Sequence, residues 1–369
     1  MLWPARISVR AVPSGTNLWG RPGRDRRRRH PRRWARQGRD RIEPLVPFPR
    51  APRSAIAVPQ NESNGGSPHV YRETRGRRGR RVSLGGLVTG HLAAGVRGAV
   101  DFARRRLTGD YRLDEFGLDE HLLESLILPA LRPLSQLWFR VQVTGIENLP
   151  ESGGALIVAN HAGVLPLDGL MLQVAVHDHH PGHRALRLLA ADLVFELPIV
   201  SALARRAGHT RACPTGAERL LRTGELAGVF PEGFKGVGKP YRARYKLQRF
   251  GRGGFASVAL KTGVPLIPCS IVGSEEIYPK LADLTPLARL LGLPYFPVTP
   301  LFPHLGVLGA IPLPSKWHIE FGEPIPTATY GPQAADDPIA MFEVSDQVRE
   351  TIQHALYKRL TQRRNPFAG

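Results

Sequence analysis

Two short polar segments stand out in this sequence, because each follows an apolar run that predicts a buried strand. The first segment is Asn160-His161, with Asp168 downstream, after the apolar residues 155–159. An imidazole ordinarily titrates near neutral pH and can take a proton from an alcohol. A carboxylate bonded to the ring would fix its tautomer, as in a catalytic triad without the serine. His161 and Asp168 are therefore the candidate general base and its orienting partner.

The second segment is Phe230-Pro231-Glu232-Gly233, after the apolar residues 226–230. Residues 235–261 contain eight cationic side chains and no Asp or Glu. Interleaved glycines let backbone amides approach an anion, so a phosphate or the pyrophosphate of CoA is a plausible ligand. A solvated basic loop is the alternative. The eight cations are Lys235, Lys239, Arg242, Arg244, Lys246, Arg249, Arg252 and Lys261.

Other motifs carry less weight. Gly233 to Lys239 nearly matches a phosphate-binding P-loop, but Pro240 stands where a Mg²⁺-binding hydroxyl is needed, so an NTPase is disfavoured. No Gly-x-Ser-x-Gly elbow is present, which counts against a serine hydrolase. A histidine-rich stretch predicts a hydrated turn more than a zinc site. It comprises His177, His179, His180 and His183.

The two cysteines, Cys213 and Cys269, are too few and too far apart for a disulfide framework or a zinc-thiolate site. We expect both to be buried, reduced thiols, and we expect no metal. No apolar run of 18 or more uncharged residues predicts a transmembrane helix. No signal peptide is predicted, although Arg80-Arg81 before a modest apolar stretch faintly resembles a twin-arginine export signal.

The charge is concentrated at the N-terminus. Residues 1–81 hold 21 of the 51 Lys and Arg residues but only 5 of the 31 acids. This Arg-, Pro- and Gly-rich stretch has no sustained apolar period, so we expect a disordered basic tail. It could bind anionic lipid or nucleic acid by counterion release, although a nucleic-acid partner is disfavoured.

Residues 82–117 predict an amphipathic helix followed by a linker. Apolar residues from Leu84 to Ala103 mostly recur at helical spacing, and arginines lie largely off that stripe. The helix either lies in a membrane interface or packs on the domain. A second apolar stretch, residues 284–314, is too rich in proline for a continuous helix. It is either a loop that covers an acyl-chain channel or dips into lipid, or a well-packed loop that closes the core.

Residues 118–369 predict one α/β domain, a layered mixed sheet flanked by helices, because predicted strands and helices alternate along the chain. Thr215 to Glu218 fits a capping box, and Gly263 is a predicted helix stop. Strands are expected at 139–143, 155–159, 186–190, 226–230, 266–272 and 318–321. Helices are expected at 118–131, from 168, at 198–206, from 215 to near 224, at 254–262 and at 338–360.

The two polar segments, in this order and about 70 residues apart, resemble the glycerolipid acyltransferase family typified by lysophosphatidate acyltransferase. That family carries Asn-His-x-x-x-x-Asp, then Phe-Pro-Glu-Gly-Thr-Arg, then Val-Pro-x-x-Pro. The third motif is matched by Val264-Pro265-Leu266-Ile267-Pro268, and Gly253-Gly254-Phe255 resembles the start of the helix before it. The resemblance covers about residues 135–325.

The resemblance implies an O-acyltransferase in which His161 is the base and Asp168 its partner. A hydroxyl of a lysophospholipid or related glycerolipid would attack the thioester of acyl-CoA or acyl-carrier protein, with no other cofactor and no metal. Substrate would be bound by a set of polar residues and glycine. This set is Asn160, Glu232, Gly233, Lys235, Lys239 and Arg211. The expected location is peripheral, on the cytoplasmic face of the cell membrane.

Three departures from the family pattern affect the site. Six residues separate His161 from Asp168, where the family has four, so a bulge is needed; Gly163 and Pro166 would permit it. Phe234-Lys235 replaces Thr-Arg, and a lysine lacks the bidentate grip of arginine on phosphate. Arg211 is a displaced match to the family's remaining basic residue. A non-enzymatic lipid- or nucleic-acid-binding protein and a lipid or thioester hydrolase are the alternative functions.

Overall fold

The computed structural model describes residues 100, 104–105, 107–109, 112–251, 253–293, 295–363 and 365–367, apart from the side chain of Pro198. The described residues fall in one unit that spans residues 77–369. The predicted tail, residues 1–81, lies outside the described residues. So does most of the predicted amphipathic helix and linker, residues 82–117.

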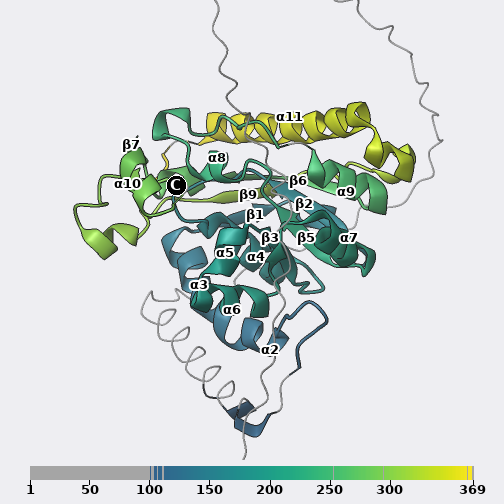
Figure 1. Cartoon of the computed structure of the whole chain (residues 1–369), viewed down its shortest axis with the longest axis horizontal. Coiled ribbons are helices and arrows are strands. Elements are labelled where there is room, and N and C mark those ends of the chain that lie inside the picture. The colour runs from purple at the N-terminus through teal and green to yellow at the C-terminus, as the bar shows by residue number, and fades with distance from the viewer. Residues whose placement is uncertain are drawn as a thin grey trace, which may run out of the picture. The chain divides into compact units, whose positions relative to one another are not determined.

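A mixed sheet of seven strands forms the centre of this unit and confirms the predicted fold class (Figure 1). The strands are arranged in the order β1-β9-β6-β2-β5-β3-β4. Their bounds are β1 Gln142–Thr144, β2 Ala155–Ala159, β3 Leu186–Ala190, β4 Thr210–Arg211, β5 Leu226–Val229, β6 Leu266–Val272 and β9 His318–Phe321.

Five neighbouring strands run in the same direction. Strand β2 pairs in parallel with β5 and β6, and β3 pairs in parallel with β5 and β4. Strand β9 is antiparallel to β6, and β1 is parallel to β9. The carboxyl ends of β6, β2, β5, β3 and β4 therefore meet at one side of the sheet, which we call the carboxyl edge.

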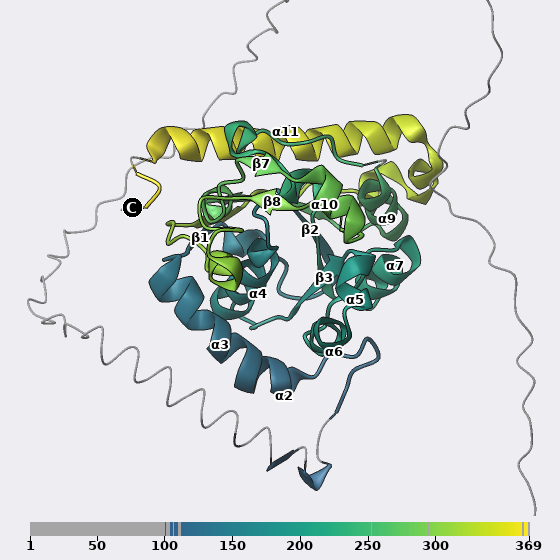
Figure 2. The ribbon, with the colours of Figure 1, turned by 60° about the vertical axis from the view of Figure 1, so that its left-hand side comes forward.

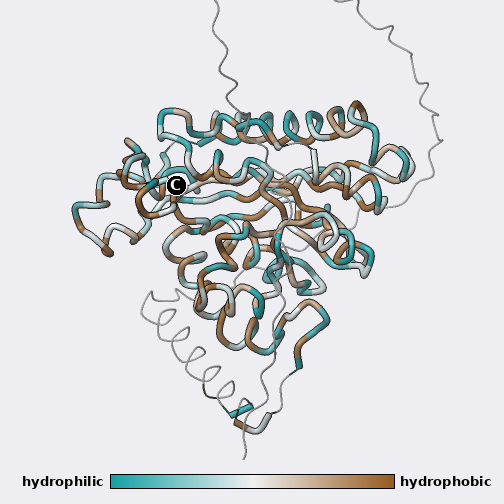
Figure 3. Tube along the Cα trace, viewed as in Figure 1, coloured by the Kyte–Doolittle hydropathy of each residue, from teal (hydrophilic) through white to brown (hydrophobic). Residues whose placement is uncertain are grey.

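Helices cover both faces of the sheet, and each face has its own apolar core (Figures 1 and 3). Side chains alternate along β2, so Ile157 packs in one core while Leu156 and Val158 pack in the other. Both β2 and β6 are completely buried, as expected for parallel strands covered on both faces. One face carries α2 Glu120–Leu122, α3 Leu128–Pro133 and α4 Leu167–His179; the other carries α7 Pro214–Arg222, α9 Gly254–Thr262 and α11 Pro338–Gln362.

Several short elements lie at the carboxyl edge, which faces the viewer in Figure 2. They follow the strands whose ends form this edge. They are α5 Asp192–Glu196, α6 Pro198–Arg206, α8 Phe234–Val237, η4 Tyr241–Ala243, η5 Ser274–Glu276, β7 Ala282–Asp283, α10 Thr285–Leu290, β8 Pro297–Val298 and η6 Gly306–Ala310. Strands β7 and β8 pair as a small antiparallel sheet. Three further turns are η3 Ile146–Asn148, η7 Ala328–Tyr330 and η8 Pro332–Asp336.

Two helix ends show how the local sequence sets the boundaries. Helix α9 ends at Gly263, whose φ of +71° suits a residue without Cβ, and the Gly263 amide donates to the Ala259 carbonyl at 2.8 Å. This confirms the predicted helix stop. Helix α11 begins after Asp337, whose carboxylate accepts from the amide of Ile339 at 2.9 Å.

Other sequence predictions were wrong. The helix expected at 118–131 contains one π-helical stretch, η1 Leu123–Ile127, and continues past residue 131 into a second, η2 Leu134–Trp138. Phe139 therefore ends a helix instead of opening a strand, and its ring stacks on Trp317 with centroids 4.5 Å apart. Helix α7 begins at Pro214 with no side-chain capping bond, so the capping box is absent.

The two cysteines have different environments. Cys269 is buried in β6, where burial raises the pKa of its thiol well above the usual value. Cys213 is exposed, contrary to expectation, because it lies just before α7 at the surface. In the part of the chain that the structure describes, no helix has both the length and the apolar character needed to cross a bilayer.

We predict that Gly154→Ala destabilises the domain, because the new Cβ would overlap the carbonyl oxygen of Leu221 at the end of α7. Gly154 immediately precedes β2, so the overlap displaces a central strand. The expected loss is about 1–3 kcal/mol, measured by urea unfolding. Gly254→Ala is the matched control, since nothing lies within 4 Å of its added Cβ. Equal stabilities of the two variants would contradict this reading of Gly154.

Candidate active site at the carboxyl edge

The structure brings His161 and Asp168 into direct contact. His161 lies two residues after the end of β2, and Asp168 lies in the first turn of α4. The Nδ1 atom of His161 is 2.7 Å from Oδ2 of Asp168. The Asp168 side chain is fully buried, whereas 14% of the His161 side chain is exposed. Within the described residues no group hydrogen-bonds Nε2, so this nitrogen is available to a ligand.

The loop between them accommodates the six intervening residues. Gly163 has a φ of +83°, a conformation that favours glycine. The amide of Leu167 donates to the carbonyl of Leu165 at 2.8 Å, which closes a tight turn around Pro166. The hydroxyl of Tyr295 donates to the Val164 carbonyl at 2.6 Å. Gly163 and Pro166 thus make the bulge that the spacing required.

Two backbone amides hold the Asp168 carboxylate in place. Its Oδ2 accepts from the amide of Ala162 at 2.8 Å, and its Oδ1 accepts from the amide of Gly169 at 2.9 Å. The carboxylate therefore has a fixed orientation toward Nδ1 of His161. With the Nδ1 proton donated to Asp168, Nε2 carries the free lone pair of the neutral ring.

The second motif supports the histidine from the other side. The Phe230 ring packs against the His161 ring, with centroids 4.6 Å apart. The amide of His161 donates to Oε1 of Glu232 at 3.0 Å. Because β2 and β5 are adjacent and parallel, their loops meet here. Glu232 therefore acts on the position of His161 through its main chain.

Glu232 also belongs to a buried ion-pair network. Lys239 Nζ lies 3.4 Å from Oε2 of Glu232 and 3.0 Å from Oε1 of Glu275, and all three residues are buried. Burial raises the pKa of Glu275 to about 7, against the opposing effect of Lys239. The amide of Gln248 also donates to Oε2 of Glu232, at 2.6 Å.

Sequence reasoning missed Glu275. It lies in η5, just after β6, and β6 is the neighbour of β2 on the side away from β5. Glu275 could have been suspected from the sequence, because it follows a third apolar run that predicts a buried strand. If that strand is parallel and adjacent to the other two, all three end at the same edge. The sequence alone does not show that β6 and β5 flank β2.

The other predicted substrate-binding residues fall into two groups. Asn160 is buried, and its side-chain amide donates to the carbonyl of Ile271 and accepts from its amide, which ties β2 to β6. Like Asn160, Glu232 and Lys239 are engaged by the protein itself. Lys235 on α8 and Arg211 on β4 are exposed, and Gly233 has open space around its Cα.

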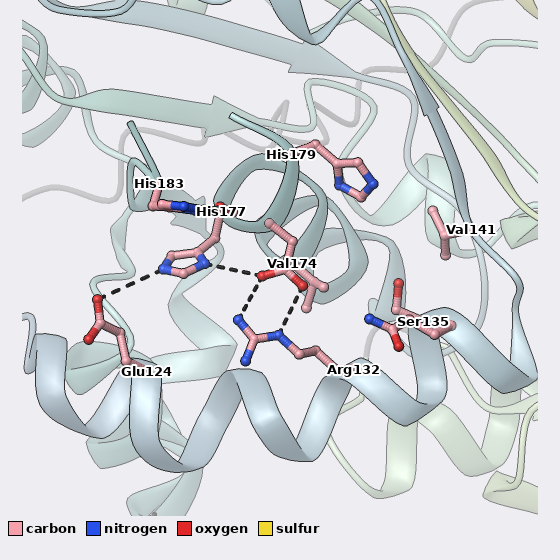
Figure 4. Close-up of a pocket in the computed structure, with 10 residues that line it drawn as sticks. Glu124, Arg132, Ser135, Val141, Val174, His177, His179 and His183 are labelled. Carbon is pink, nitrogen blue, oxygen red and sulfur yellow. Dashed lines mark hydrogen bonds and ion pairs between the residues drawn. The ribbon is translucent and has the colours of Figure 1, made fainter. Parts of the chain in front are cut away.

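The histidine-rich stretch lies elsewhere. His177, near the end of α4, is about 14 Å along the helix from Asp168. Together with Arg132 and Asp178, it lines a cavity of about 580 Å³ (Figure 4). Its Nδ1 is 3.2 Å from Asp178, which Arg132 binds through two hydrogen bonds. Among the described residues, no group of His, Cys, Asp and Glu is arranged to hold a metal ion.

A comparison with protein families matches residues 140–272 to the acyltransferase family model. This span contains His161, Asp168, Glu232 and Lys239 at the positions described above. The chain belongs to the glycerolipid acyltransferase family. It is an acyltransferase, which favours the enzymatic interpretation over a non-enzymatic binding protein.

Three relatives illustrate the range of similarity. An uncharacterized protein of Mycobacterium tuberculosis is 63% identical over 278 residues, which are 75% of this chain and 78% of that protein. The human "DGAT1/2-independent enzyme synthesizing storage lipids" is 27% identical over 60% of this chain and 62% of its own length. The "1-acyl-sn-glycerol-3-phosphate acyltransferase" of Borreliella burgdorferi is 27% identical over 39% of this chain and 57% of its own length.

For the acyltransferase, we predict that Lys239→Met causes a large loss of stability. It would leave the buried carboxylates of Glu232 and Glu275 without their shared cation, which typically costs about 3–5 kcal/mol. Lys235→Met is the control, because Lys235 is exposed and should change stability by less than about 0.5 kcal/mol. Thermal unfolding of both variants tests this. Similar melting temperatures would show that Lys239 is not part of a structural network.

We predict that Glu275→Gln changes how stability depends on pH. The pKa of Glu275 rises from 4.5 to about 7 on folding, so between these values the folded protein holds a proton that the unfolded chain has lost. The stability contributed by the protonated group is present below pH 4.5 and is lost as pH rises through 7, with a slope of up to about 1.4 kcal/mol per pH unit.

The wild-type protein should therefore lose stability relative to Glu275→Gln as pH rises from about 5 to about 8. Urea unfolding across this range measures the difference. Glu323→Gln is the control, because Glu323 is exposed and lies outside the network. A difference that stays constant with pH would mean that Glu275 titrates as an ordinary carboxyl.

Proposed function

We propose that this acyltransferase moves a fatty acyl group from acyl-CoA or acyl-carrier protein to a hydroxyl of a lysophospholipid or related glycerolipid. The observation that carries the proposal is the 2.7 Å contact between His161 and a buried Asp168, with Nε2 free at the carboxyl edge. The name of the Borreliella burgdorferi relative, an acyltransferase acting on 1-acyl-sn-glycerol-3-phosphate, supports a glycerolipid acceptor.

In the proposed mechanism, Nε2 of His161 removes the hydroxyl proton as the acceptor oxygen attacks the thioester carbonyl. Asp168 receives the hydrogen bond from Nδ1–H and stabilises the imidazolium that forms. The tetrahedral intermediate then collapses, the C–S bond breaks, and the imidazolium returns its proton to the departing thiolate. No acyl-enzyme and no metal takes part in this scheme. General base catalysis contributes roughly 10²–10⁴-fold, and positioning of the two substrates contributes much of the rest.

The accessible cations suggest how an anionic substrate is bound. Lys235 follows Gly233 on α8, and Arg211 lies at the carboxyl end of β4, so both belong to the edge that holds His161. We assign phosphate binding to these two residues and a positioning role to Asn160, Glu232 and Lys239. A lysine binds phosphate less specifically than an arginine does, so this site is compatible with more than one acceptor headgroup. The expected location is the cytoplasmic face of the membrane, where a thioester donor is available.

We predict that His161→Ala lowers acyl transfer by at least about 10²-fold with little change in melting temperature. Asp168→Asn should also lower it, because the amide no longer fixes the required tautomer. Radiolabelled acyl-CoA with a panel of lysophospholipid and neutral acceptors measures the transfer. His179→Ala is the control, because His179 is exposed and lies beside the distant cavity. Full activity of His161→Ala would rule out the proposed base.

Hydrolysis is the competing reaction, because the same pair can activate water. Free fatty acid and acylated lipid are therefore measured in the same assay. An acyltransferase releases CoA faster when the acceptor lipid is present and places the label in lipid. Equal rates of CoA release with and without acceptor, with the label in free fatty acid, would favour the hydrolase.

A further inference from the structure

Exposed apolar side chains gather at the carboxyl edge. Of the 24 large hydrophobic residues that are exposed among the described residues, 15 lie in the segments that follow the strands at this edge. Single exposed apolar residues are normal, but a cluster of this kind marks an interaction surface. We call these residues the apolar rim. They are Leu165, Leu197, Ile199, Val200, Leu203, Phe234, Leu281, Leu284, Leu290, Leu291, Leu293, Leu305, Val307, Leu308 and Ile311.

The sheet topology places this rim around the active site. Strands β6, β2, β5 and β3 are consecutive in the sheet and parallel. Each is followed by a segment with exposed apolar side chains: Leu165 follows β2, Phe234 follows β5, Ile199 follows β3, and Leu290 follows β6. Two of these segments also carry the catalytic machinery, since His161 follows β2 and Glu232 follows β5. The rim therefore borders the site on both sides.

The segment after β6 contributes most of the rim, and it is ordered by its own bonds. The Tyr278 hydroxyl donates to the Ala310 carbonyl, and the Leu313 amide donates to the Ile277 carbonyl at 3.0 Å. Nevertheless Leu290 is 81% exposed and Val307 is 91% exposed. This is not the pattern of a loop that closes the core, which was one interpretation of residues 284–314. The apolar side chains project from a supported scaffold.

A row of cations lies beside the rim. In residues 242–250 the side chains of Tyr245, Leu247 and Phe250 are buried. The four cations of this stretch are exposed: Arg242, Arg244, Lys246 and Arg249. Within the described residues, no acidic side chain forms an ion pair with these four. We call them the cationic strap. The amide of Tyr241 donates to the Lys280 carbonyl at 2.9 Å, which joins the strap to the segment that carries most of the rim.

We propose that the apolar rim and the cationic strap dock the enzyme on an anionic lipid bilayer, with the active site facing the membrane. A bilayer presents phosphates and hydrocarbon at adjacent depths, so it matches a surface that combines projecting leucines with unpaired cations. A second copy of the chain would present like charges to the strap. The proposal rests on the proposed function, because a glycerolipid hydroxyl must reach His161 from the bilayer.

Vesicle co-sedimentation of the full chain tests the proposal. We compare wild type with Leu290→Glu/Val307→Glu, on phosphatidylcholine vesicles with and without phosphatidylglycerol. The double variant should bind vesicles at least about tenfold more weakly than the wild type, because it removes two exposed apolar side chains and leaves the core unchanged. Ile339→Glu is the control, because Ile339 is 69% exposed at the start of α11, at the opposite end from α10 and β7 (Figure 1).

The strap makes a separate contribution to the same measurement. Arg242→Gln/Arg244→Gln/Lys246→Gln should weaken binding only to vesicles that contain phosphatidylglycerol, and added salt should abolish this difference. Wild-type vesicle binding by the rim variant would overturn the proposal. The proposal is also overturned if the wild type sediments as a dimer, the rim variant sediments as a monomer, and the variant still binds vesicles. The rim would then be a subunit interface.

An activity measurement separates this proposal from the proposed function. With a short-chain lysolipid below its micelle concentration, the rim variant should retain wild-type transfer, while transfer to acceptor embedded in vesicles should fall with binding. Loss of both activities to the same extent would show that the rim acts on catalysis and not on docking. Absence of transfer by the wild-type protein in either assay would count against the proposed function, whereas vesicle binding would still report on the rim.

Discussion

One carboxylate, that of Glu232, joins the parts of the candidate active site. Its two oxygens accept from the amides of His161 and Gln248, and the nearby Lys239 compensates its buried charge. The loop after β2, the loop after β5 and the segment that bears the cationic strap are thereby held together. A charge without water needs such partners, so the site tolerates little rearrangement around Glu232. The histidine is positioned by this network and oriented by Asp168.

The parallel arrangement of β6, β2, β5 and β3 has a second consequence. Because all four strands end at the same edge, the His161–Asp168 pair, the buried lysine and the exposed apolar segments lie at one side of the domain. Ligands of open α/β sheets bind at this side for the same reason. The proposed acyl transfer would thus use residues that follow strands far apart in the sequence.

The strongest sequence predictions concerned long apolar runs and residues with special backbone requirements. The bounds of β2, β3 and β6 were correct because each is a short, fully apolar or nearly apolar run between polar segments. Gly263 stops α9 because it adopts a positive φ. Phe139 was misplaced because an aromatic residue after a helix pattern also suits a strand, whereas its amide donates to the Leu134 carbonyl at 2.9 Å and so belongs to the helix end. Cys213 was misplaced because its exposure depends on where α7 begins.

The sequence by itself determined the chemistry that is available: a histidine and an aspartate near the end of one apolar strand, and a cation-rich loop after another. It also predicted a mixed sheet flanked by helices, because the periodicity of each element is local. Only the tertiary structure decided which polar groups meet. The sequence does not distinguish the buried polar residues Asn160, Glu232 and Lys239 from the exposed Lys235 and Arg211. Their burial and pairing depend on contacts between residues up to 111 positions apart. Strand order sets those contacts, and no local pattern encodes it.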